Sequence, residues 1–315
     1  MSSWYGADRT KRRNIGLCFK VECNVMAVKF TGCGMGDAKR KKMLGASVVR
    51  RNELSRRFEQ LGIDISTPGF YDDPGFLTEE RRDRRFLEAY AEWVIHRERL
   101  PEYDAHVRDV LGKLAPIISA RMDRHQWFGS CIAVTGMLTR MLDRLEVWNT
   151  VMRGSVAIKT VDGASRHFAI VDEDEGRGVE TGHYWLIAPP FDIVDLTLYH
   201  QRWRAGDEAF QALAPKVVLA ERTEVVKARA DDVIAPALLR SGTDAEMQRA
   251  LSDQKRFGAV FPARKLGLER LELRYVASGS TAPDVPLERV NLEARAGVPA
   301  IQIWNEDVAP AFGIR

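Results

Sequence analysis

The chain has 315 residues, 45% of them hydrophobic and 29% charged, which is enough apolar sequence for one large domain or two smaller ones. The formal net charge of +3 does not by itself indicate nucleic-acid binding. No apolar run approaches the roughly 20 residues of a membrane span, and no signal peptide is recognised at the start of the chain. The cysteines are too few for a disulfide framework and lack the CxxC pairing of zinc sites: Cys18, Cys23, Cys33 and Cys131. We therefore expect a cytoplasmic, reducing location, with no membrane partner and no metal.

The first 46 residues are predicted to be an N-terminal extension. Residues 15–25 alternate between apolar and polar side chains, which favours a half-buried strand. A glycine-containing turn at 31–36 and the basic run Lys39–Lys42 follow, without the GxxxxGK[ST] spacing of a phosphate-binding loop. A solvated basic loop is the better interpretation of this run.

Residues 47–125 are predicted to be helical. The expected helices cover Asn52–Leu61, Thr78–Leu100 and Tyr103–Ala120. Three histidines in this region lie among charged neighbours without HExxH spacing, and we interpret them as surface residues: His96, His106 and His125.

Gly129-Ser130-Cys131 is predicted to begin an amphipathic helix with Ser130 as its N-cap. We expect Val134, Leu138 and Met141 to share a buried stripe with Cys131, and Arg140, Asp143 and Arg144 to lie mostly on the other side. Free N–H groups and the helix dipole in the first turn favour an anion, so the pKa of the Cys131 thiol should be lowered there. The alternative is that Cys131 is a small buried hydrophobic residue.

Four strands are predicted next, separated in the middle by a hairpin loop at Asp172–Gly182: Asn149–Lys159, Arg166–Val171, His183–Ile187 and Phe191–Leu196. Neighbouring antiparallel strands can place His183 beside Asp195. Because side chains alternate along a strand, Asp192 should face the opposite way from Asp195, so only one of them meets the histidine. The alternative is a histidine at a sheet edge and an aspartate at a strand end, without a shared function.

Together these segments resemble the transglutaminase-like branch of the papain-like cysteine-enzyme superfamily. Members have a Gly-x-Cys helix start, a strand beginning His-x-Trp and a strand ending Asp-x-Thr; here these are Gly129–Cys131, His183–Trp185 and Asp195–Thr197. The resemblance covers roughly residues 126–200. It implies a nucleophile at Cys131, a general base at His183 and an orienting carboxylate at Asp195.

Other residues in this region compete for the same roles. His167 also begins a strand-like segment and is the alternative base, and Asp192 is the alternative carboxylate. Gln126 lies near the place where papain-like enzymes carry a glutamine that helps bind the oxyanion, although its spacing differs; the backbone N–H of Cys131 is the other expected donor. Trp127 is either a wall of the site or a core aromatic residue.

Residues 205–315 are predicted to be a mixed α/β region that packs on the core or forms a lid. The expected helices are Ala205–Leu213, Asp231–Arg240 and Thr243–Phe257, and the expected strands are Lys216–Val226, Leu268–Val276 and Ala300–Trp304. We thus predict an α+β protein in four parts: an extension (1–46), a helical region (47–125), a transglutaminase-like core of one helix on an antiparallel sheet (126–204) and this region.

The leading functional hypothesis is acyl transfer, or hydrolysis of an amide or peptide bond, through a thioester on Cys131. A protease or amidase is favoured over a transglutaminase, the partner is a protein, peptide or amide substrate, and no cofactor is implied. One rival is a catalytically silent papain-like interaction module. Another is nucleic-acid binding through basic segments, which is not favoured: Arg9–Arg13, Lys39–Lys42, Arg50-Arg51 and Arg56-Arg57.

Overall fold

An antiparallel sheet forms the centre of the fold in the computed structural model, which describes residues 37–172, 181–290 and 298–314. These residues belong to one compact unit, Cys33–Arg315, and the strand predicted at 15–25 lies outside them. The strand order is β5-β4-β3-β1-β8-β7-β6, with β2 also paired to β1. The strands are β1 (Thr150–Thr160), β2 (Ser165–Phe168), β3 (His183–Ala188), β4 (Phe191–Asp195), β5 (Val218–Ala220), β6 (Glu224–Val226), β7 (Ala263–Gly267) and β8 (Leu271–Thr281).

The sheet is curled, and its two ends come close together. Strands β5 and β6 stand at opposite ends of the strand order, yet only residues 221–223 separate them. Thr223 in this short link donates from its hydroxyl to Asp192 on β4 (2.8 Å), and Arg264 on β7 contacts the same carboxylate oxygen (3.4 Å). The single strand predicted over Lys216–Val226 is therefore wrong, because the chain turns sharply at 221–223 from one end of the sheet to the other.

The four strands predicted between residues 149 and 196 are confirmed within a few residues as β1 to β4. The predicted alternation of side chains between the two faces of the sheet is also confirmed. Ile193 and Trp185 pack into one hydrophobic cluster, whereas Val194 and Leu186 pack into another. Both faces of this part of the sheet are therefore covered, and the side chains near the end of β4 are buried. Most of the predicted hairpin loop falls at 173–180, outside the described residues.

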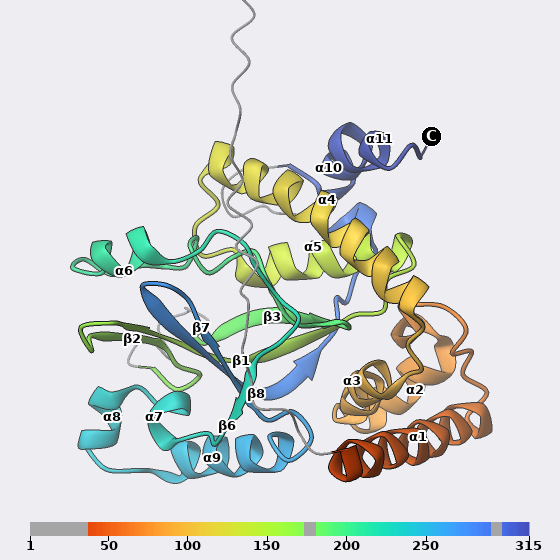
Figure 1. Ribbon diagram of the computed structural model, residues 1–315, viewed down its shortest axis with the longest axis horizontal. Helices are drawn as coiled ribbons and strands as arrows, with labels where there is room; N and C mark the ends of the chain where they lie inside the picture. Colours follow the sequence, from red (N-terminus) through yellow and green to blue (C-terminus); the bar gives the residue numbers. More distant parts are fainter. Residues whose placement is uncertain (1–36, 173–180, 291–297, 315) are drawn as a thin grey trace, which may run out of the picture. The chain divides into compact units, whose positions relative to one another are not determined.

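Helices α4 (Pro101–His125) and α5 (Cys131–Arg144) cover one face of the sheet (Figure 1). Both were predicted from their apolar spacing, and Pro101 occupies the first turn of α4, where its missing N–H has no cost. The buried residues of α5 include Val134, Met137 and Leu138. They belong to the same hydrophobic cluster as residues of α4 and Leu186 of β3. The prediction that Arg140 lies on the side of the helix away from the buried stripe is wrong. Arg140 is buried, and its guanidinium binds Asp72 and two backbone carbonyls.

Helices α1 (Asp37–Gln60), α2 (Pro74–Arg82) and α3 (Phe86–His96) pack beside the sheet around an aromatic cluster, together with the short helix Phe70–Asp72. The basic run Lys39–Lys42 lies within α1, not in a loop. The helix predicted over Thr78–Leu100 is two helices with a break at 83–85, and the first begins earlier because Asp73 caps Gly75 and Phe76.

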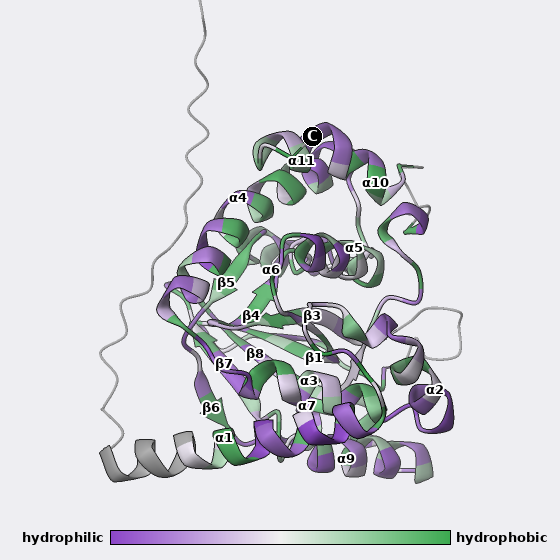
Figure 2. Ribbon diagram, turned by 90° about the vertical axis from the view of Figure 1, so that its right-hand side faces the viewer, coloured by the Kyte–Doolittle hydropathy of each residue, from purple (hydrophilic) through white to green (hydrophobic). Residues whose placement is uncertain are grey.

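Helices α7 (Ala230–Val233), α8 (Pro236–Arg240) and α9 (Ala245–Phe257) pack around Val276 of β8 and Ala263 of β7, away from α4 and α5 (Figure 1). Figure 2 shows hydrophobic colouring along β4 and β5 and largely hydrophilic colouring on α9. Asp244 caps α9, since its side chain accepts a hydrogen bond from the N–H of Met247. Helix α6 (Glu208–Leu213) follows the core strands.

The C-terminal part contributes both sheet and helix. Residues 205–315 supply β5 to β8, so they complete the sheet that β1 to β4 begin. The strand predicted at Ala300–Trp304 is wrong: Ala300–Ile303 is helix α10, followed by a π-helical turn (Trp304–Val308) and α11 (Ala309–Ala311). A 3-10 turn, Leu287–Arg289, precedes them. A short apolar run does not distinguish a buried strand from a buried helix, and here the run packs against α4.

Candidate functional site

The start of α5 places Cys131 at the first helical position, half-buried. Ser130 stands at the N-cap position, but its hydroxyl donates to the Trp127 carbonyl (2.6 Å) and does not cap the helix. Gly129 has a φ of 69°, and its N–H donates to the His200 carbonyl (2.7 Å). An added Cβ at 129 would lie 2.7 Å from the exposed side chain of Arg202, and the left-handed φ favours glycine at this position. The N–H of Cys131 thus belongs to a first turn fixed against the segment that follows β4.

His183 begins β3 and is completely buried. It pairs with Gly154 of β1, where an added Cβ would lie 2.2 Å from the Val276 carbonyl oxygen and 2.7 Å from the Trp185 ring. Gly182, immediately before His183, has a φ of 89°, and an added Cβ there would lie 2.8 Å from the Gly154 carbonyl oxygen. These two glycines allow the backbone to bring the imidazole into the interior, and Trp185 stacks beside it.

Asp195 at the end of β4 receives four hydrogen bonds inside the protein. His183 Nε2 lies 2.6 Å from Oδ2, and the Tyr275 hydroxyl donates to the same oxygen (2.9 Å). The backbone N–H of Thr197 (2.8 Å) and its hydroxyl (3.0 Å) donate to Oδ1. A buried carboxylate satisfied in this way is held in one orientation, and it fixes the imidazole in turn.

Electrostatics couple the three predicted residues. Burial by itself lowers the pKa of His183, but the charge and hydrogen bond of Asp195, together with a hydrogen bond to the Cys131 side chain, raise it to about 10. Burial alone raises the pKa of Asp195, yet His183, Thr197 and Tyr275 hold it below the ordinary value. The structure therefore brings Cys131, His183 and Asp195 together in the order Cys–His–Asp.

Two further residues of this cluster escaped the sequence analysis. Gln201 is buried, and its Nε2 lies 2.8 Å from His183 Nδ1 and 3.2 Å from the Thr197 carbonyl oxygen. Tyr275 reaches Asp195 from β8, which pairs with β1. Gln201 follows Thr197 by four residues, which is a weak sequence signal that the two could lie close together. No local sequence signal points to Tyr275, because only the pairing of β1 with β8 brings it close to Asp195.

The alternative base and carboxylate lie elsewhere. His167 is on β2 opposite Ala157, three residues along β1 from the partner of His183, and its Nδ1 is buried without a hydrogen-bond partner among the described residues. Asp192 faces the other way from Asp195. It accepts a hydrogen bond from Thr223 and contacts Arg264 of β7, so it connects β4 with the opposite end of the sheet. Only Asp195 meets His183, as strand alternation predicts.

The two residues considered for the wall and the oxyanion site are placed differently. Gln126 ends α4 with a φ of 52°, is exposed, and donates to the Asp123 carbonyl (2.8 Å), so its amide is engaged with its own helix. Trp127 is buried in the core cluster of α4 and α5, stacked on His125. It fits the core interpretation.

The other histidines and basic residues make internal contacts. Nδ1 of the half-buried His96 lies 2.9 Å from the Ser47 hydroxyl, and Nε2 of the exposed His106 lies 2.9 Å from the Leu145 carbonyl; the half-buried His125 stacks on Trp127. The prediction of surface residues is therefore wrong for His96 and His125. Arg50 binds Glu92 through two bonds of 2.6 Å and also pairs with Glu53 (3.1 Å).

Arg51 pairs with Glu98, Arg56 bonds the Asn52 carbonyl, and Arg57 lies over the Phe86 ring. Together with Arg50, these arginines contact partners within the fold.

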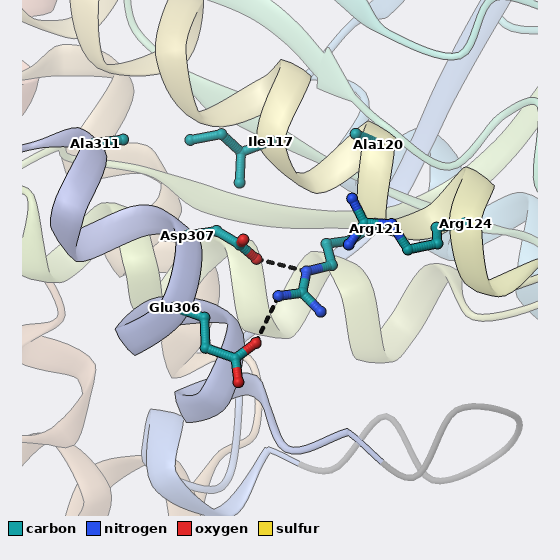
Figure 3. Close-up of a pocket in the computed structure, with 7 residues that line it drawn as sticks. All are labelled: Ile117, Ala120, Arg121, Arg124, Glu306, Asp307 and Ala311. Atoms are coloured by element: carbon teal, nitrogen blue, oxygen red, sulfur yellow. Dashed lines mark hydrogen bonds and ion pairs between the residues drawn. The ribbon is translucent and has the colours of Figure 1, made fainter. Parts of the chain in front are cut away.

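A pocket of about 380 Å³ lies between α4 and the C-terminal helices, away from this cluster (Figure 3). Arg121 in this pocket donates to Asp307 (2.5 Å) and Glu306 (2.7 Å), so its positive charge is balanced by these two carboxylates. In the part of the chain that the structure describes, no group of three potential metal ligands is found, and no helix is long and apolar enough to cross a bilayer.

Comparison with protein-family models, with curated proteins and with solved structures finds no match for the chain.

Proposed function

We propose that this protein is a cysteine-dependent hydrolase or acyltransferase acting on amide or peptide bonds through a thioester at Cys131. The observation that carries the proposal is the buried imidazole of His183, bonded through Nε2 to Asp195 and in contact with the Cys131 side chain. A nucleophile, a base and an orienting carboxylate in this order are the elements of covalent acyl transfer. The resemblance to transglutaminase-like enzymes assigns the same three roles.

The proposed chemistry has two halves. His183 takes the thiol proton at Nδ1, and Sγ of Cys131 attacks the carbonyl carbon. The resulting oxyanion accepts from the free N–H of Cys131 in the first turn of α5. When the C–N bond breaks, the amine leaves with the proton from the imidazolium and a thioester remains.

In the second half, water gives up a proton to His183 and attacks the thioester carbonyl. The acid is released and the thiol is restored. An amine in place of water gives acyl transfer, and we retain hydrolysis as the favoured outcome. Throughout, Asp195 keeps the imidazole oriented and stabilises its charged form.

Acylation by p-nitrophenyl acetate tests this proposal without knowledge of the natural substrate. The full chain should release a burst of nitrophenol near one equivalent, and peptide mapping by mass spectrometry should place the acetyl group on Cys131. Cys131→Ala should abolish the burst. A burst that survives in Cys131→Ala, or an acetyl group mapped to another residue, would refute the assignment of the nucleophile.

A further inference from the structure

The amide of Gln201 occupies a position beside the imidazole that neither the triad nor the proposed reaction explains. Its Nε2 lies 2.8 Å from Nδ1 of His183, the nitrogen that does not bind Asp195. In the proposed reaction this nitrogen must accept the thiol proton. The residue is 4% exposed, so a donor and an acceptor meet here with little access for water.

The orientation of the amide follows from its second contact. Nε2 also lies 3.2 Å from the carbonyl oxygen of Thr197, an atom that only accepts hydrogen bonds. Turning the amide over would set two oxygens against each other. The NH₂ group therefore points at both atoms, and it donates one hydrogen to Thr197 and the other to Nδ1.

An amide that donates to Nδ1 requires a lone pair there. The contact therefore favours the neutral imidazole whose Nε2–H donates to Asp195 over the imidazolium. The titratable groups that face the ring are Asp195 from β4 and Cys131 from α5, with the Tyr275 ring 6.3 Å away on β8. Asp195 favours the protonated imidazole, whereas the Gln201 contact favours the neutral one, so the two neighbours act in opposite directions.

We propose that Gln201 is a positioning residue that competes with the Cys131 thiol for Nδ1 of His183 and so opposes formation of the thiolate–imidazolium pair. The inference rests on the proposed function, because it assigns the regulation of the same site. Formation of the thiolate–imidazolium pair requires the amide to give up Nδ1. Substrate binding that displaces the Gln201 amide from Nδ1 would then promote formation of the thiolate, so that Cys131 is activated only in the complex with substrate.

The pH dependence of Cys131 alkylation by iodoacetamide, followed on the full chain by peptide mapping, tests the proposal. Gln201→Leu removes the donor and should move the acidic limb of the profile to lower pH by about half to one unit, the effect of one neutral hydrogen bond. Gln201→Glu is nearly isosteric and places an acceptor beside Nδ1. It should therefore move the limb further in the same direction.

Gln254→Leu is the matched control, since Gln254 is a buried glutamine on α9 and should leave the limb in place. Unshifted limbs in both Gln201 variants, or a limb moved to higher pH in Gln201→Leu, would overturn the inference. His183→Ala separates the two proposals. If it leaves the Cys131 profile unchanged, the proposed function fails; if it changes the profile while the Gln201 variants do not, only the role of Gln201 fails.

Discussion

The Tyr275 hydroxyl donates to the same oxygen of Asp195 that binds His183, although Tyr275 lies 80 residues further along the chain. The carboxylate is therefore held by β8 as well as by the turn that follows β4. Orientation of the imidazole depends on the pairing of β1 with β8, and not on β3 and β4 alone.

Tyr275→Phe should weaken both the fold and the site. Removing a buried donor to a charged acceptor is expected to lower the free energy of unfolding by about 1–3 kcal/mol and to slow Cys131 alkylation several-fold. Urea unfolding and alkylation rates measure the two effects. Tyr90→Phe is the control: this buried hydroxyl accepts from the Gly69 N–H, so its loss should affect stability alone. Equal alkylation rates in Tyr275→Phe and wild type would argue against this support of Asp195.

Asp195→Asn should keep the fold and lower the rate of p-nitrophenyl acetate hydrolysis by on the order of 10²-fold to 10³-fold. This is less than the roughly 10⁴-fold loss in a serine triad, because a thiol ionises more readily than a hydroxyl. Asp192→Asn should leave the rate within about two-fold, since Asp192 binds Thr223 and Arg264 and not His183. A larger loss in folded Asp192→Asn would transfer the carboxylate role to Asp192.

Gly154→Ala should be severely destabilising. The new methyl group would lie 2.2 Å from the Val276 carbonyl oxygen and 2.9 Å from Ala277 Cα, both backbone atoms of the paired strand β8. We expect a loss of at least about 3 kcal/mol in the free energy of unfolding. Gly267→Ala on β7, where a Cβ meets nothing within 4 Å, should change it by no more than about 1 kcal/mol. Comparable effects of the two variants in urea unfolding would contradict this prediction.

Asp143 should make stability depend on pH. Burial raises the pKa of this carboxyl from 3.8 to about 7, against the opposing effects of Tyr71, Arg140 and Asn149. Between these values the folded state keeps a proton that the unfolded state releases. The contribution to the free energy of unfolding is therefore fully present below about pH 4, and it is lost as the pH rises through about 7. Asp143→Asn should remove this pH-dependent decrease in the free energy of unfolding. The measurement is the difference in free energy of unfolding between wild type and variant, from urea unfolding at pH 4 to 8. A difference that stays constant with pH would contradict it.

Local patterns predicted the elements that carry the triad. The 3.6-residue spacing along α5 and the alternation in β1 to β4 identified those elements. Alternation implied that only one of Asp192 and Asp195 could meet His183, and the Asp-x-Thr resemblance pointed to Asp195. Features that depend on long-range packing were missed. Tyr275 needed the β1–β8 pairing, and the burial of Arg140 needed Asp72 and the carbonyls of Pro283 and Val285.

Some local errors have equally physical causes. The residues Ala300–Ile303 are apolar in a run too short to reveal a helical period, and the turn at 221–223 lacks glycine and proline, so the split between β5 and β6 was not visible. The Ser130 hydroxyl donates to the Trp127 carbonyl and so does not cap α5, and Gly129 between these residues has a positive φ.

The most direct test of the central claim compares the two histidines as bases for Cys131. The measurement is the rate of p-nitrophenyl acetate hydrolysis in His183→Ala and His167→Ala, with folding verified by circular dichroism. We expect His183→Ala to lose nearly all activity, on the scale of Cys131→Ala, because members of such a triad act as a unit. His167→Ala should keep most of the activity, since His167 lies on β2 and not at the Asp195 carboxylate. Activity retained in folded His183→Ala and lost in folded His167→Ala would contradict the assignment of His183 as the base.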